Sequence, residues 1–176
     1  MPALIQLEQY IVITLNQLAL SSGLLLFGVR FFAVSAIFII VGFFILSFFI
    51  NWDFFRVTSK LIFIEGLLAG SLAWLFNQFI GFIYNRERPY LALENIEALI
   101  GDTVTQKSFP SDHTTVAFAL AGIIYFWSPK AGIIFLILAL LIGVSRIVVG
   151  IHYPSDVFVG MILGIFFAWF IHRFFI

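Results

Sequence analysis

Long apolar segments, separated by short polar ones, form the pattern of this sequence. The first uninterrupted apolar segment covers residues 31–50, and a helix of about twenty residues matches a hydrocarbon core about 30 Å thick. The pattern predicts an all-α integral membrane protein, with residues 1–176 forming a single domain built as a helical bundle. The later apolar segments lie at about 58–85, 111–127, 131–149 and 157–175.

The N-terminal segment, residues 3–22, is less apolar than those that follow. Glu8, Asn16 and several glutamines interrupt its hydrophobic residues, a mixture typical of an amphipathic helix that lies in the membrane interface. A short first spanning helix is the alternative. The bundle is therefore predicted to contain five to six transmembrane helices.

The one long polar stretch covers residues 86–110, with Pro89 near its start and Pro110 at its end. We expect it to form a re-entrant or partly helical loop at one face of the membrane. Ser111 and Asp112 follow directly, and both residue types are favoured at helix starts. The next span should therefore begin there.

The composition supports the membrane assignment. The chain of 176 residues is 62% hydrophobic and 10% charged, whereas soluble domains are typically about a quarter charged. Its formal net charge is 0, and it has no polybasic patch that would indicate nucleic acid as a partner. The sequence contains no cysteine, which excludes disulfides, thiolate catalysis and cysteine metal sites.

Successive spans cross the membrane in alternate directions, which decides the face of each loop. The second span ends near Arg88, the third begins beside His113, and the fourth ends near Arg146 and His152. These residues, far apart in the sequence, are therefore predicted to meet at one face.

The basic residues give a weak orientation signal. Apart from the suspected site residues, the site face carries Arg30, Arg86 and Lys107. The slight excess on the other face favours that face as cytoplasmic and the site as outward-facing. The basic residues of the other face are Arg56, Lys60, Lys130 and Arg173.

Residues 145–156 place charged groups at the junction of two apolar segments, where they are costly and so indicate function. Arg146, together with Arg88, can bind phosphate oxygens because guanidinium is always charged and presents paired donors. Ser111 could add a hydroxyl, and N–H groups at the helix start near Asp112 could add further donors. The sequence therefore predicts a phosphate-processing site on a membrane enzyme.

Two histidines supply candidate chemistry at this site. We expect His152 to be the nucleophile, with Asp156 four residues later orienting its imidazole. Attack on phosphorus would form a phosphohistidine, with His113 first as general acid and then as base for water. Because arginines neutralise the phosphate and no carboxylate cluster suits magnesium, we expect no essential metal and no cofactor.

Other charged residues have simpler interpretations. Arg86 could be an interfacial anchor or a substrate contact, and Lys107 could be a topology signal or a substrate contact. Glu65, inside the second span, is interpreted as a carboxylate near one interface, neutral or paired with a neighbour. His172 lies on the opposite side and is expected to take no part.

The motifs resemble those of the type 2 phosphatidic acid phosphatase superfamily, whose fold is shared with vanadium haloperoxidases. The resemblance covers about residues 58–175 and implies a vanadium-haloperoxidase-like core. The third motif of that family is matched by Ser145, Arg146, His152 and Asp156, the second by 110–113, and the end of the first by Arg88 and Pro89.

Gly81 stands where the first motif of the family usually has a lysine. A phosphate-binding cation is therefore missing or is supplied by Arg86 or Lys107. The combination of Asp112 with Asn77 and the first-motif residues resembles the undecaprenyl-diphosphate phosphatase branch. That resemblance implies a multi-pass protein of the bacterial inner membrane with an outward-facing site that releases inorganic phosphate from a lipid diphosphate.

Three functional hypotheses follow from the sequence. The leading one is hydrolysis of polyprenyl diphosphate to the monophosphate and inorganic phosphate. The alternative substrates are phosphatidic acid and phosphatidylglycerophosphate. A protein that binds or transports lipid phosphate without turnover is the hypothesis of another class; it would need polar residues along the spans, whereas here they gather at one end.

Overall fold

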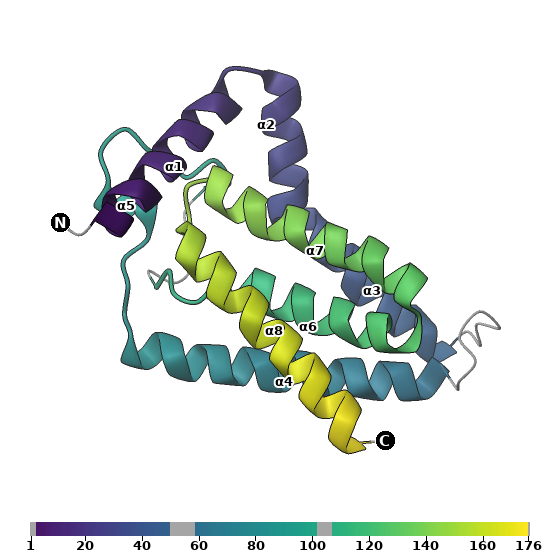
Figure 1. Cartoon of the computed structure of the whole chain (residues 1–176). Coiled ribbons are helices and arrows are strands. Elements are labelled where there is room, and N and C mark those ends of the chain that lie inside the picture. Colours follow the sequence, from purple (N-terminus) through teal and green to yellow (C-terminus); the bar gives the residue numbers. More distant parts are fainter. Residues whose placement is uncertain (1–2, 50–58, 102–106, 176) are drawn as a thin grey trace.

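The computed structural model describes residues 3–49, 59–101 and 107–175, and every regular element in these ranges is a helix (Figure 1). This confirms the all-α fold class. The predicted loop at 51–57 and the centre of the polar stretch, 102–106, lie outside the described residues. The elements are α1 (Ala3–Leu20), α2 (Gly23–Arg30), the π-helical turn η1 (Phe31–Ser35), α3 (Ala36–Phe49), α4 (Ser59–Ile83), α5 (Pro89–Ala92), α6 (Asp112–Trp127), α7 (Pro129–Val148) and α8 (Pro154–Phe175).

Among the described residues, 4 helical segments are long and apolar enough to cross a membrane. They make the chain a multi-pass membrane protein. The first of them joins α2, η1 and α3, so it begins before the segment predicted at 31–50. Their outer surfaces expose large apolar side chains such as Phe82 and Phe38, as suits contact with lipid. The segments are Gly23–Phe49, Lys60–Ile83, Pro129–Val148 and Pro154–Phe175.

Helix α6 forms the centre of the bundle, between α4, α7 and α8 (Figure 1). It has 16 residues, and other helices rather than lipid surround most of them. Small residues let α8 approach closely: a Cβ on Gly164 would lie 2.4 Å from the main-chain oxygen of Thr115. Such small residues are typical of helix contacts in membranes, where packing replaces the hydrophobic effect.

A buried polar contact joins α4, α6 and α8 at one end of the bundle. Glu65 is fully buried, and its Oε2 accepts a hydrogen bond from Trp127 Nε1 at 3.1 Å. The same oxygen lies 3.0 Å from His172 Nδ1. Glu65 is therefore paired with neighbours, as the sequence interpretation had it.

Helix α1 lies against α7 and α8 and is not one of the candidate spans among the described residues. Its polar residues bind the end of α7 and the polar loop, at the end of the bundle away from Glu65. Asn16 Nδ2 donates to the main-chain oxygens of Val148 and Glu97, each at 3.0 Å. The main-chain N–H of Glu97 donates back to Asn16 Oδ1 at 3.2 Å. The polar residues that made this segment ambiguous are thus contacts with the loops beside the predicted site.

Candidate active site

Two short stretches of the polar loop lie side by side and bring basic residues together. Glu87 and Lys107 form an antiparallel bridge, and the N–H of Ser108 donates to the main-chain oxygen of Arg86 at 2.7 Å. Residues 86–88 therefore lie next to 107–108, although the sequence separates them by most of the loop.

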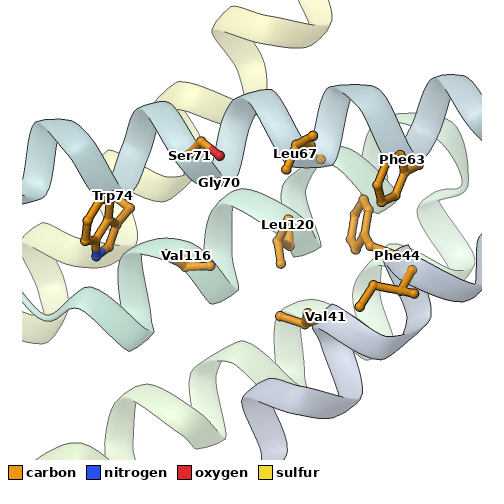
Figure 2. Close-up of a pocket in the computed structure, with 11 residues that line it drawn as sticks. Val41, Phe44, Phe63, Leu67, Gly70, Ser71, Trp74, Val116 and Leu120 are labelled. Atoms are coloured by element: carbon orange, nitrogen blue, oxygen red, sulfur yellow. The ribbon is translucent and has the colours of Figure 1, made fainter. Parts of the chain in front are cut away.

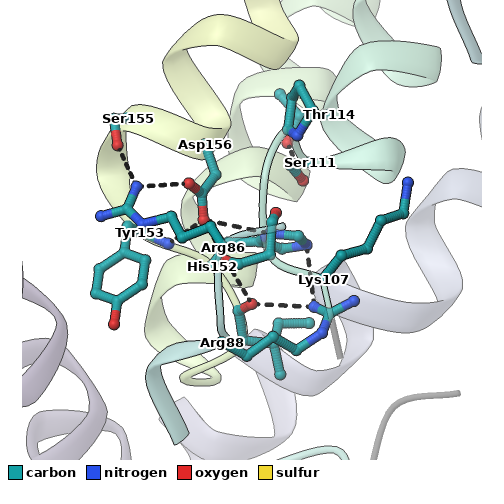
Figure 3. Close-up of polar contacts among 12 residues, drawn as sticks. Arg86, Arg88, Lys107, Ser111, Thr114, His152, Tyr153, Ser155 and Asp156 are labelled. Atoms are coloured by element: carbon teal, nitrogen blue, oxygen red, sulfur yellow. Dashed lines mark hydrogen bonds and ion pairs between the residues drawn. The ribbon is translucent and has the colours of Figure 1, made fainter. Parts of the chain in front are cut away.

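His152 lies in the turn between α7 and α8 and is 3% exposed. Its Nδ1 is 2.7 Å from the main-chain oxygen of Ser108 (Figure 3). A carbonyl oxygen can only accept, so Nδ1 carries the proton and donates it. In the neutral ring the lone pair is then on Nε2, which lies 3.4 Å from Arg88 Nη1. The main chain thus selects the tautomer whose lone pair is on Nε2, where it accepts a long hydrogen bond from Arg88.

Asp156 is fully buried in the first turn of α8 and holds three separate segments together. Its carboxylate accepts from the N–H of Tyr153 at 2.8 Å, from Arg86 Nη1 at 2.8 Å and from the hydroxyl of Ser108. Its Oδ2 lies 3.6 Å from His152 Nδ1. The expected carboxylate–imidazole pair is therefore an electrostatic contact, while the hydrogen bond that orients the ring goes to the Ser108 carbonyl.

The protonation of His152 follows from these surroundings. Burial lowers the pKa of His152 to about 4, and the charges of Arg146 and Arg88 act in the same direction. The negative charge of Asp156 raises the pKa but does not reverse the shift. The ring is therefore neutral at neutral pH.

Two buried guanidinium groups lie close to this ring. Arg88 Nη1 donates to the main-chain oxygen of Ile151 at 3.0 Å, and burial lowers the pKa of Arg88. Arg146, in the last turn of α7, donates from Nη1 to the main-chain oxygen of Ala33 at 2.6 Å. Its Nε is buried and has no hydrogen-bond partner among the described residues. A buried donor without an acceptor is costly, so the site is suited to an anion.

The start of α6 completes this side of the site. Ser111 is fully buried; its N–H donates to the main-chain oxygen of Asp156 at 3.1 Å, and its hydroxyl accepts from Thr114 Oγ1 at 2.9 Å. His113, in the first turn, lies within electrostatic reach of Arg146 and His152. The N–H groups of a helix's first turn favour an anion. The structure therefore brings all three motif regions to one place.

Arg86 is directed at protein partners. It donates to Ser155 Oγ at 2.7 Å and to Glu8 Oε2 at 2.8 Å, in addition to Asp156, and its guanidinium lies 3.8 Å from the ring centroid of Tyr153. Burial alone would lower the pKa of Arg86, but Asp156 and Glu8 outweigh it and the net pKa is raised. These contacts favour a positioning role for Arg86 over a phosphate contact.

Lys107 lies over Gly81. A Cβ on Gly81 would be 2.8 Å from both Cδ and Nζ of Lys107, so a larger residue there would displace the lysine. The ammonium group donates to Gln78 Oε1 and lies 3.9 Å from Asp112 Oδ1. Asp112 in turn accepts from Asn77 Nδ2 and, at 3.1 Å, from Gln78 Nε2. Asp112 and Lys107 therefore belong to one polar cluster at the end of α4.

Sequence reasoning missed three residues that support the site. Ser108 contacts both His152 and Asp156, Glu8 receives Arg86 and the N–H of Ser155, and the oxygen of Ala33 receives Arg146. The sequence did contain an indication for Glu8, because a carboxylate within an apolar segment needs a partner. The described residues contain no group of three His, Cys, Asp or Glu placed to hold a metal ion.

Comparison with known proteins connects this geometry to a family. The model described as "PAP2 superfamily" matches residues 59–176. The bacitracin transport permease protein BcrC of Bacillus licheniformis is 33% identical over 122 residues, 69% of this chain and 60% of that protein. The undecaprenyl-diphosphatase BcrC of Bacillus subtilis (strain 168) is 34% identical over 123 residues, 70% of this chain and 63% of that protein. The match thus covers about three fifths of the length of these curated relatives.

Solved structures share the fold. The crystal structure of Aquifex aeolicus LpxE has a TM-score of 0.78 and 26% identity, covering 97% of this chain and 94% of that one. A PAP2 type phosphatidylglycerolphosphate phosphatase from Bacillus subtilis has a TM-score of 0.71 with 21% identity, over 99% of this chain and 87% of that one. The second likeness concerns the fold alone.

Proposed function

Because this chain belongs to the PAP2 superfamily, we propose that it is a lipid phosphatase that hydrolyses a polyprenyl diphosphate to the monophosphate and inorganic phosphate. One observation carries the proposal most directly. The Ser108 carbonyl keeps the proton of His152 on Nδ1, which leaves a nucleophilic nitrogen beside two buried arginines. A neutral, oriented imidazole next to an anion site is what phosphoryl transfer to histidine requires.

In the first step, the lone pair of His152 Nε2 attacks the terminal phosphorus and forms a P–N bond. The bond from phosphorus to the bridging oxygen breaks, and the electron pair leaves with the polyprenyl monophosphate. Burial and the charges of Arg146 and Arg88 disfavour a protonated His113, and the negative charge of the bound diphosphate offsets them. The protonated ring of the substrate complex then donates a proton to this leaving oxygen as general acid. The positive charge that develops on the imidazole is stabilised by Asp156, 3.6 Å from Nδ1.

In the second step, water attacks the phosphohistidine. His113, now neutral, accepts a proton from the water as its oxygen bonds to phosphorus. The P–N bond breaks, its electrons return to Nε2, and inorganic phosphate leaves. Both histidines are then in their starting states.

In both steps the non-bridging oxygens are bound by Arg88, Arg146, Ser111 and the first N–H groups of α6. Donors that are already in place stabilise the charge of the transition state without reorganisation. The buried Nε of Arg146 gains the acceptor that it lacks among the described residues. The expected reaction needs no metal ion or cofactor.

The substrate assignment rests on the relatives and on one additional cation. A relative is named undecaprenyl-diphosphatase, and a diphosphate carries a second phosphate that needs a second cationic contact. Lys107 supplies that contact from above Gly81. Other relatives are named lipid A 1-phosphatase, for example that of Rhizobium johnstonii, so lipid monophosphates are the competing substrates.

We place the protein in a bacterial inner membrane with the site facing outward. The slight excess of basic residues at the other membrane face supports this orientation.

Phosphate release from purified protein in detergent tests the proposal. The substrates are undecaprenyl diphosphate, undecaprenyl monophosphate, phosphatidic acid and phosphatidylglycerophosphate, each with and without a chelator. We expect undecaprenyl diphosphate to have the highest kcat/KM, unchanged by the chelator. Preference for a glycerolipid would overturn the substrate assignment, and tight lipid binding without phosphate release would favour the non-catalytic hypothesis.

A further inference from the structure

Two cavities along the first spanning segment differ in the side chains that line them. The one between α3, α4 and α6 is lined by apolar side chains, glycines and one serine, with Trp74 towards one end and Phe63 with Phe44 towards the other (Figure 2). The second cavity, of about 510 Å³, lies between the junction of α2 with η1 and the polar loop at residues 98–101. Arg30 lines this second cavity, which we call the Arg30 cavity. It therefore combines a cation with an opening at the surface of the bundle.

Arg30 has no anionic partner among the residues that the structure describes. Its Nε donates to the main-chain oxygen of Leu99 at 2.6 Å, and a neutral carbonyl does not compensate a full positive charge. Arg30 also lies within the spanning segment Gly23–Phe49, where a charged side chain is costly without a counter-charge. The two Nη groups of Arg30 are thus placed to bind an anion from outside the protein.

The apolar side chains beside Arg30 indicate that this anion belongs to a lipid. Phe27, Phe31 and Val34 are spaced three or four residues apart, so they form one stripe on the helix, and all three are exposed and line the cavity. The stripe continues to Phe38, which is exposed and lies about 12 Å further into the membrane than Arg30. A free phosphate needs only the cation, whereas a phospholipid uses the cation for its phosphate and the stripe for an acyl chain.

We propose that the Arg30 cavity binds an anionic phosphodiester lipid, of the phosphatidylglycerol type, from the leaflet at the active-site face. The phosphate accepts hydrogen bonds from the Nη groups of Arg30, and one acyl chain packs on Phe31 and Val34. A zwitterionic lipid would bring its own ammonium group and so compensate the arginine less well. A diester has no terminal phosphate, so this lipid is a bound ligand and not a substrate.

Both walls of the Arg30 cavity contact the end of α7, which carries Arg146. On one wall, the main-chain oxygen of Ala33 in η1 accepts from Arg146 Nη1 at 2.6 Å. On the other wall, Leu99 accepts from Arg30 and donates its N–H to the main-chain oxygen of Val149 at 3.1 Å. A lipid that binds between these walls should stabilise the position of Arg146 and so promote turnover. This consequence rests on the proposed function, whereas the binding itself does not.

Native mass spectrometry measures which lipid the protein retains when it is released from nanodiscs with equal amounts of phosphatidylglycerol and phosphatidylcholine. We expect phosphatidylglycerol to be retained about fivefold over phosphatidylcholine, the effect of one basic residue on anionic lipid. In Arg30→Gln the preference should fall below about twofold. Arg173→Gln, exposed near the end of α8, is the matched control and should keep the preference. An unchanged preference in Arg30→Gln, or an equal loss in Arg173→Gln, would overturn the proposal.

Two further measurements distinguish a lipid from other anions. Excess inorganic phosphate should leave the bound phosphatidylglycerol in place, and its displacement would show a site for free phosphate instead. The anion could also be a carboxylate of the chain, and Asp102 follows Gly101 in the sequence. Asp102→Asn should therefore leave the lipid preference unchanged, whereas a several-fold gain would show that this carboxylate occupies the arginine.

Photolabelling tests the cavity in the unsubstituted protein, so that it does not depend on the folding of Arg30→Gln. A phosphatidylglycerol with a diazirine near the start of its acyl chain should label Phe31, Val34 or Phe38 more than the outer faces of α7 and α8. The corresponding phosphatidylcholine should label these three residues less. Equal labelling by the two lipids, or label spread evenly over all the helices, would contradict the proposal.

Turnover separates the lipid site from the phosphatase assignment. In phosphatidylcholine nanodiscs, added phosphatidylglycerol should raise kcat/KM for undecaprenyl diphosphate about fivefold in the unsubstituted protein and in Arg173→Gln, and less than about twofold in Arg30→Gln. Equal stimulation of Arg30→Gln would overturn the link to Arg146. Absence of turnover in every lipid would contradict the proposed function, while the retained-lipid and labelling measurements would still decide whether the Arg30 cavity binds an anionic lipid.

Discussion

The Nδ1 atom of His152 lies 2.7 Å from the main-chain oxygen of Ser108, nearer than the carboxylate of Asp156 at 3.6 Å. The orientation of the ring is thus given by the main chain of the polar loop. The role of Asp156 is to hold the loop, through the hydroxyl of Ser108 and through Arg86, and to provide negative charge near the imidazole. The hydrogen bond that selects the tautomer cannot be removed by replacing the side chain of Ser108.

This contact predicts an unusual titration of His152. With histidine ¹⁵N labelling, its ring should give the neutral Nδ1–H pattern from pH 8 to pH 5, with a midpoint near the pKa of about 4. The unfolded chain binds a proton below about 6.5, whereas the folded chain does so only below about 4. His152 therefore stabilises the fold above about 6.5, and this contribution is lost as the pH falls towards 4. A midpoint near 6.5, or a neutral ring protonated on Nε2, would contradict this arrangement.

The contacts of Arg86 predict coupling with Glu8. Arg86→Lys and Glu8→Gln should each lower kcat about tenfold with KM within about twofold, because both loosen the same contact with the start of α8. The double variant should be less than additive, with a coupling of about 0.5–3 kcal/mol. Lys130→Gln, exposed at the opposite end, serves as the control and should have no effect. A large rise in KM for Arg86→Lys, with Glu8→Gln silent, would instead indicate a phosphate contact.

Because Lys107 lies above Gly81, a lysine introduced at position 81 should be able to replace the ammonium group of Lys107. Lys107→Met should raise KM for the diphosphate about tenfold or more, the value of one charge-assisted hydrogen bond. Adding Gly81→Lys to this variant should restore most of the loss, because the new side chain enters the space that Lys107 left. Gly81→Met in the same background is the control and should not rescue. Equal rescue by methionine would show that the charge is not needed.

Gly150 predicts a stability effect with an internal control. Its φ is +80°, and a Cβ would lie 2.7 Å from Ile96 Cγ2 and 2.9 Å from the main-chain oxygen of Glu97. Gly101 has the same φ of +80° with nothing within 4 Å of a Cβ. Gly101→Ala should cost about 1–2 kcal/mol of unfolding free energy for its left-handed backbone, and Gly150→Ala measurably more. Thermal unfolding in detergent measures the loss in both variants. Equal losses would mean that the turn at Gly150 shifts to make room for the new Cβ.

Much of this architecture follows from the apolar pattern. Segments of about twenty apolar residues have few alternatives to spanning helices. The number of spans between Arg88, His113 and His152 predicts that all three lie at one face of the membrane. The arginines and histidines of the site could also be predicted, because a charged side chain next to an apolar span is costly and so indicates a function.

The supporting contacts could not be predicted in the same way. The carbonyl oxygens of Ser108 and Ala33 act through the main chain, which every residue has, so no residue type indicates them. The π-helical turn that contains Ala33 interrupts a run of apolar residues without any sequence signal. The place of Lys107 over Gly81 depends on how the polar loop folds back on α4, and the sequence left Arg86 and Lys107 as equal candidates for that cation.

The proposed mechanism depends on a covalent bond between His152 and phosphorus, which rapid quenching can detect. The protein is mixed with undecaprenyl diphosphate carrying ³²P in its terminal phosphate, quenched in alkali within milliseconds, and digested for mapping. An alkali-stable, acid-labile label should appear on the peptide containing His152, be absent in His152→Ala and be retained in His172→Ala. Label that persists in His152→Ala, or turnover unimpaired by that substitution, would show that His152 is not the nucleophile.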